Sequence, residues 1–504
     1  MKIDVKANTK KNVVVGVINK TVLLVLPFFT KKLINIYLGA EYLGLNSLFT
    51  SILSVLSLTE LGVSGAMVYH MYKPIANDDY PMLCALLNFY RKVYVVIGLA
   101  TTVLGILVLP VLPQLVKGSY PSDINIYVIY LFQLASNVIG YFLFGYKQSL
   151  LAAYQREDIN SFINLFTQGG MQLLQLALLV VTRNYYFYVI CLPIFTIVNN
   201  LWIEFFTKKL YPTVTCKGKI DSNVLASIKK LVAGSFIQRA CAVSRNSLDS
   251  VCISAFVGLT LTGVYNNYYT VFNGITVMLS IIIASLTGGI GNHVAIKSVD
   301  ENYKEFEAID QTYLLISGWC TCCLLCLSQP FMRLWMGKDM QMSDLSVGLM
   351  CLYFYMLKVG DVRGIYYSTT GMWWEMRYRS IAETVCNLVL NLALGFIFGI
   401  NGIIMATVIS LFFFNFLWGS KIVFHNYFGD EKLKRYFRYQ LKSFVFSLTL
   451  CISAFWITNK IVFDSAALEF VVRGGVCACY SLIACLLIVR RNKNIKSIFA
   501  MIRK

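Results

Sequence analysis

The residues best suited to chemistry in this sequence are charged side chains that lie inside long apolar runs. Most of them gather in three of these runs. The three sets are Lys20, Lys31 and Lys32; Arg239, Arg245 and Asp249; and Lys358, Asp361 and Arg363. A Lys, Arg or Asp at the centre of a membrane helix costs roughly 2.5 to 3.5 kcal/mol on insertion scales, so such residues usually face protein or a watery cavity. These positions are therefore candidates for binding an anionic group.

Two of the carboxylates are spaced for pairing with a basic neighbour on the same helix. Asp249 lies one helical turn after Arg245, and Asp361 lies one turn after Lys358. Side chains three or four residues apart are neighbours on a helix surface. We therefore expect Asp249 and Asp361 to serve pairing or coupling, together with Glu60, which lies inside another apolar run.

Four basic side chains remain as the best candidates for an unpaired charge that faces a substrate: Lys20, Lys31, Arg239 and Arg363. On a helix that turns about 100° per residue, Lys20 and Lys31 return to within about 20° of one face and can line one groove. Each of these residues could instead form a buried ion pair, or extend its aliphatic side chain so that its charge reaches the lipid headgroups. The second alternative is favoured for Lys32.

Several convergent cations in a place of low dielectric suit a phosphate or pyrophosphate, because Arg offers a planar fork and Lys a compact charge. Catalysis has less support, since the three His residues are scattered and no Gly-rich phosphate loop follows a strand. A membrane-bound glycosyltransferase or polymerase remains the catalytic alternative. The sequence thus favours binding and transport over an enzyme.

The fifteen Cys residues lie mostly inside apolar runs, where reduced thiols are expected. The densest group spans Cys320 to Cys326 and has a loosely metal-like spacing. It lies within one apolar helix and has no His or carboxylate partner there. We therefore expect neither a metal site nor a cofactor.

The elements that position these residues are predicted to be membrane-spanning helices. Of 504 residues, 57% are hydrophobic and 14% are charged, whereas soluble domains carry about 25% charged residues. Apolar runs of the roughly 20 residues needed to cross a bilayer recur along the chain. The expected class is an all-α polytopic membrane protein with about 14 transmembrane helices. The predicted spans are 13–38, 43–71, 93–115, 124–146, 159–181, 186–206, 231–256, 264–292, 311–332, 345–370, 380–398, 402–424, 441–461 and 467–489.

The basic residues outside the spans set the expected orientation. Most of the 44 Lys and Arg fall in loops on the same side of the membrane as the amino terminus. The positive-inside rule then places both termini in the cytoplasm. The net charge of +19 accordingly points to topology and anionic lipid, with no nucleic-acid partner.

An internal repeat organises the predicted helices. Sliding the chain by 219 residues superimposes the start of the first span on the start of the seventh. This shift pairs Lys20 with Arg239, Gly39 with Gly258, and Gly44 with Gly263. It contains six spans, an even number, so both copies enter the membrane in the same direction. Two parallel six-helix lobes with a site between them are expected, followed by a C-terminal helix pair. The corresponding ranges are 1–212, 213–428 and 429–504.

Two short stretches carry a family resemblance, Leu38 to Gly44 (LGAEYLG) and Leu58 to Ser64 (LTELGVS). With these residues, the length and the span count, the chain resembles the polysaccharide-biosynthesis flippases, the O-antigen and related exporters of the multidrug/oligosaccharidyl-lipid/polysaccharide superfamily. Glu60 stands in an acidic-Leu-Gly pattern that is similar to one late in the family's second helix. Gly258 to Tyr265 and Ala153 to Arg156 also look like family positions.

This resemblance implies a flippase for undecaprenyl-pyrophosphate-linked oligosaccharide repeat units in a bacterial cytoplasmic membrane. Alternating access would carry the substrate from the inner to the outer leaflet. The resemblance implies cationic residues in the cavity as a class, without matching individual positions of the family. The expected partners are the lipid-linked oligosaccharide, membrane lipids and glycan polymerase or ligase proteins, and the expected state is a monomer. The candidate substrate-binding residues are Lys20, Lys31, Arg239, Arg245, Lys358 and Arg363.

Two other functions stay open at this point. A drug or metabolite antiporter of the multidrug and toxin extrusion type should have a cavity dominated by acidic residues, which attract cations. The charged residues in the apolar runs of this sequence are mostly basic, which argues against that function. A flippase for the peptidoglycan lipid precursor is a close variant of the first hypothesis.

Overall fold

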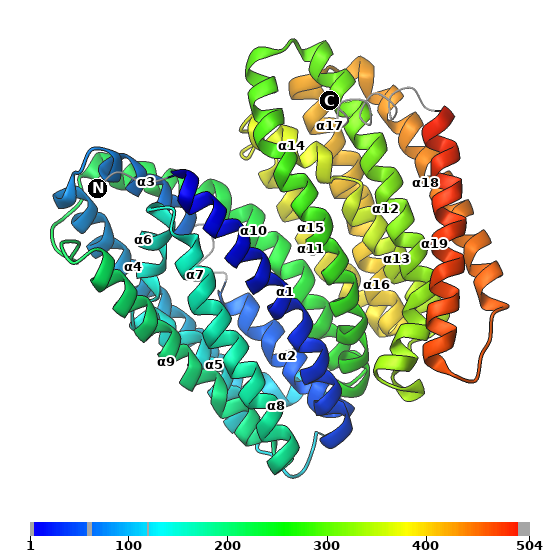
Figure 1. The fold of residues 1–504 in the computed structure, drawn as a ribbon, viewed down its shortest axis with the longest axis horizontal. Coiled ribbons are helices and arrows are strands. Elements are labelled where there is room, and N and C mark those ends of the chain that lie inside the picture. Colours follow the sequence, from blue (N-terminus) through cyan, green and yellow to red (C-terminus); the bar gives the residue numbers. More distant parts are fainter. Residues whose placement is uncertain (1–4, 58–62, 118–119, 492–504) are drawn as a thin grey trace. The chain divides into compact units, whose positions relative to one another are not determined.

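The computed structural model describes residues 5–57, 63–117 and 120–491. Every regular element in these ranges is helical, as Figure 1 shows, which confirms the predicted all-α class. The chain forms two compact units, Met1–Gly263 and Val264–Lys504. Each unit is described below by itself.

The first unit contains ten α-helices and three short helical segments in the described residues. They are α1 (Val5–Tyr37), α2 (Ala40–Leu56), α3 (Val63–Ala76), α4 (Tyr80–Val108), η2 (Leu109–Leu115), α5 (Ile126–Phe142), η3 (Gly145–Lys147), α6 (Gln148–Ala153), α7 (Glu157–Asn164), η4 (Leu165–Gly169), α8 (Gly170–Thr182), α9 (Tyr185–Leu210) and α10 (Ser222–Phe256). The second unit begins at Val264, within the next helix, α11.

The elements of the second unit follow the same pattern of long helices. They are α11 (Leu259–Ile296), α12 (Val299–Trp335), η5 (Lys338–Met340), α13 (Asp344–Lys358), α14 (Asp361–Thr369), α15 (Arg377–Phe398), α16 (Ile400–Ser410), η6 (Leu411–Trp418), α17 (Gly419–Val423), η7 (Phe424–Phe428), α18 (Asp430–Asn459) and α19 (Ala466–Arg491).

These helices make the chain a multi-pass membrane protein. Ten helical stretches of the described residues are long and apolar enough to cross a membrane, and the bent pair Ile126–Phe142 and Gly145–Ala153 makes an eleventh candidate. The other three predicted spans coincide with α1, with α2 and α3 together, and with α10. All fourteen predicted spans therefore correspond to helices in the part of the chain that the structure describes, which leaves out residues 58–62 of the second span.

Local sequence explains where several helices begin. Asn184 caps α9 by accepting a hydrogen bond from the backbone N–H of Tyr186 at 2.8 Å. Ser298 and Glu301 form a reciprocal capping box at the start of α12. Such caps satisfy backbone donors that have no partner within the helix.

The repeat detected in the sequence has a structural counterpart at its glycines. Gly39 and Gly258 directly precede α2 and α11, and both have a positive φ, 106° and 125°. Glycine adopts this conformation without the steric cost that a side chain brings. Gly44 lies against the backbone of Leu259, and a Cβ atom on Gly263 would lie 2.9 Å from the carbonyl oxygen of Ala40. Repeat-related glycines thus form one close crossing of α2 and α11.

Packing in the first unit joins helices far apart in the sequence. α1 packs on α7 and α8, α5 packs on α4 and α9, and α10 packs on α2 and α3. The contact of α10 with α2 and α3 places α10 in the first unit, whereas the repeat assigns residues 213–428 to a second lobe. The lobe boundaries stay a prediction. Lobes are defined by the sequence repeat, whereas the two units are defined by the contacts between helices.

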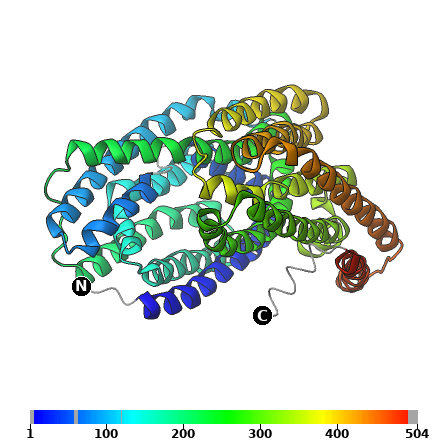
Figure 2. The same cartoon turned by 90° about the horizontal axis from the view of Figure 1, so that it is seen from above.

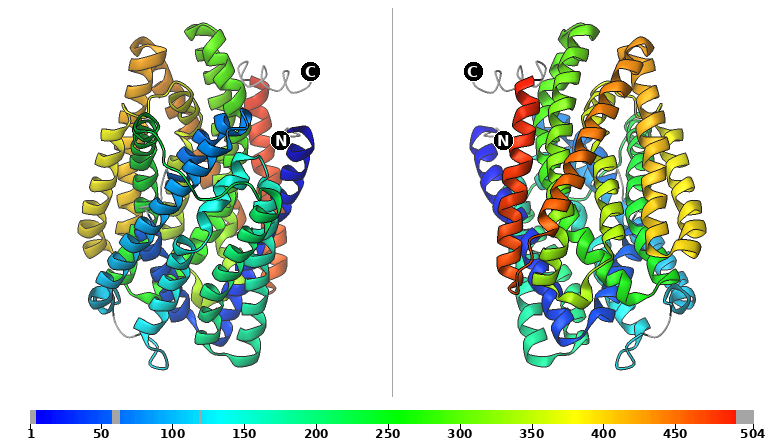
Figure 3. Two further views of the ribbon diagram at one scale, coloured as in Figure 1. Left: turned by 90° about the vertical axis from the view of Figure 1, so that its left-hand side faces the viewer. Right: turned by 90° about the vertical axis from the view of Figure 1, so that its right-hand side faces the viewer.

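Packing in the second unit centres on α12, which contacts α13, α18 and α19. The C-terminal pair α18 and α19, orange and red in Figure 3, lies beside this helix. α15 and α16 lie side by side, as the view in Figure 2 also shows. This arrangement brings polar residues of seven elements together inside the unit, namely α12, α13, α14, α15, η6, α17 and α18.

Candidate functional site

The structure describes the predicted site residues to different extents. Glu60 and the side chain of Arg239 lie outside the described residues. Lys20 is exposed on α1, and Lys31 on the same helix is partly buried. On α10, Arg245 is partly buried and Asp249 is buried. Substrate binding by the four basic residues, and pairing or coupling by Glu60 and Asp249, remain predictions.

The third predicted set forms a defined ion pair at a break between two helices. Lys358 ends α13, Asp361 begins α14, and their charged atoms are 2.8 Å apart. This confirms the pairing predicted from their spacing. Tyr313 of α12 donates a second hydrogen bond to Asp361 at 2.6 Å. Asp361 stands in the first turn of α14, where the positive end of the helix dipole favours a carboxylate.

Arg363 lies two residues after Asp361 and is almost fully buried, with 2% of its surface exposed. Its guanidinium donates to the carbonyl oxygen of Asn415 at 2.6 Å and to the side-chain oxygen of the same residue at 3.0 Å. It also donates to Ser420, to Tyr436 and to the carbonyl of Phe416. Asn415 and Phe416 belong to the π-helical segment η6, whose wider turn alters the usual backbone pairing.

The contacts that described residues make with Arg363 are all with neutral groups, so its charge has no direct carboxylate partner among them. The nearest glycine backbones fit closely around it, since a Cβ atom on Gly360 would lie 2.9 Å from its Nη2 atom. The sequence predicts Arg363 to be unpaired and to face a substrate. The structure surrounds the side chain with a cage of neutral acceptors, and its substrate-facing role stays a prediction.

Other buried charges surround this cage. Arg379 pairs with Glu383 at 2.9 Å and donates to Asn415 at 3.2 Å, so two arginines share one amide oxygen. Asp310 of α12 accepts hydrogen bonds from Tyr439 at 2.6 Å and from Gln440 at 2.7 Å. We call this group the second-unit network and define it by its charged members. They are Asp310, Lys358, Asp361, Arg363, Arg379 and Glu383. Three cations and three carboxylates balance one another in it.

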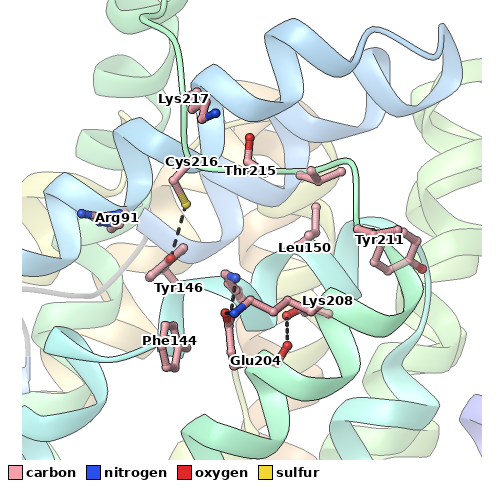
Figure 4. Close-up of a pocket in the computed structure, with 14 residues that line it drawn as sticks. Arg91, Phe144, Tyr146, Leu150, Glu204, Lys208, Tyr211, Thr215, Cys216 and Lys217 are labelled. Carbon is pink, nitrogen blue, oxygen red and sulfur yellow. Dashed lines mark hydrogen bonds and ion pairs between the residues drawn. The ribbon is translucent and has the colours of Figure 1, made fainter.

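A second candidate is a basic pocket of about 480 Å³ in the first unit (Figure 4). The end of α9 supplies Glu204 and Lys208, α4 supplies Arg91, η3 supplies Lys147, and the segment after α9 supplies Lys217. Glu204 pairs with Lys147 and, at 2.8 Å, with Lys208. Four cations face one carboxylate, which leaves a net charge of +3 on the pocket lining.

Aromatic residues complete the wall of the basic pocket. They are Phe144, Tyr146 and Tyr211. The ring of Tyr211 stacks on Tyr154, which lies outside the lining, with centroids 4.0 Å apart. Burial raises the pKa of both phenols to about 12, so both are neutral near physiological pH. Neutral rings beside fixed cations suit a ligand that combines an anionic group with a sugar or an apolar chain.

The sequence does not reveal the basic pocket as a site. Topology explains the lysines between 208 and 230, which include Lys208 and Lys217, and Arg91 and Lys147 come from two other parts of the chain. One available signal is Glu204, a carboxylate inside an apolar run, since such a residue usually has a basic partner.

No protein-family model matches the sequence, and no curated protein sequence matches it significantly. Solved structures do share its fold. A lipid II flippase, MurJ, in an inward closed conformation aligns with a TM-score of 0.67 at 15% identity, covering 94% of this chain and 98% of its own.

Two further structures extend this likeness. A multidrug resistance MATE family transporter of the MOP superfamily, inward-facing, aligns with a TM-score of 0.64 at 13% identity, covering 82% of this chain and 96% of its own. A MOP superfamily transporter from Pyrococcus furiosus Vc1 aligns with a TM-score of 0.53 at 13% identity, covering 85% and 97%. The chain therefore has the fold seen in these transporters.

Proposed function

We propose that this chain is a transporter that moves an anionic lipid-linked substrate across a bacterial cytoplasmic membrane. The substrate is a polyprenyl-pyrophosphate that carries an oligosaccharide repeat unit, and it passes from the inner to the outer leaflet by alternating access. The observation that carries the proposal is a fold shared with a lipid II flippase along nearly the whole chain, combined with cations at its polar sites. Both termini lie in the cytoplasm.

The sign of the charges supports an anionic substrate. The basic pocket has a net charge of +3, and Lys20 presents a further cation on α1. A pyrophosphate is recognised by several converging Arg and Lys donors. The aromatic residues of the pocket lining, Phe144, Tyr146 and Tyr211, support contact with sugars.

The basic pocket gives the proposal its first test. Lys217→Glu and Arg91→Glu each change two units of charge at exposed positions, without removing the buried pair of Lys147 and Glu204. We expect detergent-solubilised variants to bind a short-chain polyprenyl-pyrophosphate sugar more weakly, and the weakening to shrink at high salt because exposed charges are screened. Lys338→Glu, an exposed lysine of the second unit, is the matched control. Equal affinities in all four proteins would remove the basic pocket from the proposal.

Transport itself is measured in proteoliposomes that contain the pyrophosphate-linked oligosaccharide. Translocation is followed by the fraction of oligosaccharide that an added glycosidase can reach. A neutral polyprenyl-linked sugar serves as the control, and we expect it to be moved poorly. Movement of both lipids at one rate would refute pyrophosphate recognition.

A second candidate function is the exchange of a cationic drug or metabolite. The second-unit network favours it, because Asp310 and Glu383 are buried and Asp361 is partly buried. Asp361 and Glu383 lie inside predicted spans, Asp310 directly precedes one, and intramembrane carboxylates mark ion or proton pathways in many transporters. Uptake of a fluorescent organic cation into the same proteoliposomes, with no movement of the pyrophosphate lipid, would establish this alternative. A third candidate, transport of the peptidoglycan lipid precursor, is separated by offering that lipid in the same assay.

A genetic test addresses the predicted cations of the first and seventh spans. The double variant Lys20→Ala and Arg239→Ala should insert normally and fail to restore surface glycan in a strain that lacks its flippase. Normal glycan display would remove both residues from the proposed path.

A further inference from the structure

Three buried thiols come together in the second unit. Cys322 and Cys326 belong to α12 and Cys477 belongs to α19, and their Sγ atoms all lie within 4.8 Å of one another. Their exposed fractions are 0%, 2% and 0%. None of them belongs to the second-unit network or to the basic pocket.

Tertiary packing assembles this set. Cys322 and Cys326 are four residues apart and therefore share one face of α12. α19 packs against the same helix and brings in Cys477 from more than a hundred residues away in the sequence. Cys451 of α18 packs in the same cluster and is available as a fourth thiol. The sequence predicts no metal site because the thiols from Cys320 to Cys326 lie on one helix, and it does not reveal that Cys477 of α19 lies beside them.

The dimensions of the set suit a metal–thiolate centre. Zinc binds thiolate sulfur at about 2.3 Å and prefers four ligands in a tetrahedron, which corresponds to sulfur atoms about 3.8 Å apart. Because the three Sγ atoms lie within 4.8 Å of one another, they reach this spacing by a contraction of at most about 1 Å, which small rotations of the Cys side chains allow. Thiolates are also the ligands that select zinc and copper(I) over harder cations.

The charge around the set is also suited to an anionic centre. A zinc ion with three thiolates carries a net charge of −1. Arg473 lies one turn before Cys477 on α19, and Arg333 lies two turns after Cys326 on α12. Both arginines pair with the single carboxylate of Glu469. This cluster of two cations and one anion therefore has a net charge of +1, which offsets the charge of the centre in a medium of low dielectric.

We propose that Cys322, Cys326 and Cys477 bind one thiophilic d¹⁰ metal ion, zinc or copper(I). Each thiol that ligates the ion releases its proton, so metal binding is coupled to proton release. The centre fastens α19 to α12 and so holds the C-terminal helix pair on the second unit. This role is independent of the transported substrate.

The test is elemental analysis of the protein purified with a tag that contains neither His nor Cys, after growth in medium supplemented with zinc or with copper. We expect one metal ion per chain, and the element found distinguishes zinc from copper(I). Cys477→Ser should lose the metal. Cys479→Ser is the matched control, because Cys479 is exposed on the same helix, and it should keep the wild-type metal content.

A measurement on the unaltered protein covers the case in which Cys477→Ser fails to fold. The thiols that react with a maleimide in mild detergent are counted by mass spectrometry before and after treatment with a membrane-permeant chelator. Chelation should expose Cys322, Cys326 and Cys477 to the reagent and leave the reactivity of Cys191 unchanged. The proposal would be overturned if the wild-type protein carried no stoichiometric metal after growth in either medium. It would also be overturned if chelation left the reactivity of the three thiols unchanged.

Discussion

Replacement of Arg363 by Ala tests whether this residue is a structural cation or a substrate contact. Its guanidinium makes five hydrogen bonds inside the second unit, and two of them reach Asn415 at 2.6 and 3.0 Å. A buried acceptor that loses its partner costs about 1 to 3 kcal/mol. We expect the loss of the whole cage to lower the free energy of unfolding by about 3 to 5 kcal/mol.

The expected change is large enough to measure in detergent. For a unit of 150 to 250 residues, 1 kcal/mol shifts the melting temperature by roughly 2 to 4 °C, so Arg363→Ala should lower it by about 6 °C or more. Unfolding exposes buried thiols such as Cys351, and a thiol-reactive dye reports this. Arg363→Lys keeps the charge but loses the planar fork, so it should restore only part of the stability.

Arg377→Ala is the matched control in the same unit. This arginine stacks on the ring of Trp374 at 3.9 Å and is partly exposed. A cation–π contact at an exposed site contributes about 0.5 to 1 kcal/mol. Equal melting temperatures for Arg363→Ala and Arg377→Ala would refute the cage as a stabilising element. Loss of transport by Arg363→Ala without loss of stability would instead support the substrate-facing role predicted from the sequence.

Two further predictions concern the first unit. Gly44→Ala should destabilise it, because the added Cβ meets the backbone of Leu259, whereas Gly65→Ala meets no atom within 4 Å and should leave the melting temperature nearly unchanged; equal melting temperatures would contradict the close crossing. Burial raises the pKa of Tyr154 and Tyr211 from their ordinary value of 10.0 to about 12, so the stability that depends on the neutral phenols is fully present below pH 10 and lost as pH rises toward 12. Tyr154→Phe removes one ionising group and should flatten this decline in melting temperature, and an unchanged pH profile would contradict the assignment.

The sequence alone determined the class of the protein and the order of its helices. Apolar runs of about 20 residues identify membrane helices without knowledge of their neighbours, because the cost of burying backbone in lipid selects helices locally. The repeat is equally local in origin, and Gly39 and Gly258 share a positive φ because the same turn follows equivalent helices. The pairing of Lys358 with Asp361 also follows from spacing on one stretch of chain.

Only the tertiary structure decided which side chains from different helices meet. Helical periodicity tells which face Arg363 occupies on α14 but not that Asn415, Ser420 and Tyr436 close around it. In the same way, the basic pocket gathers cations from four separate segments, and Cys477 joins two thiols of α12 through helix packing. Contacts over such sequence separations depend on which helix faces pack together, and the pattern of residues along one helix does not contain that information.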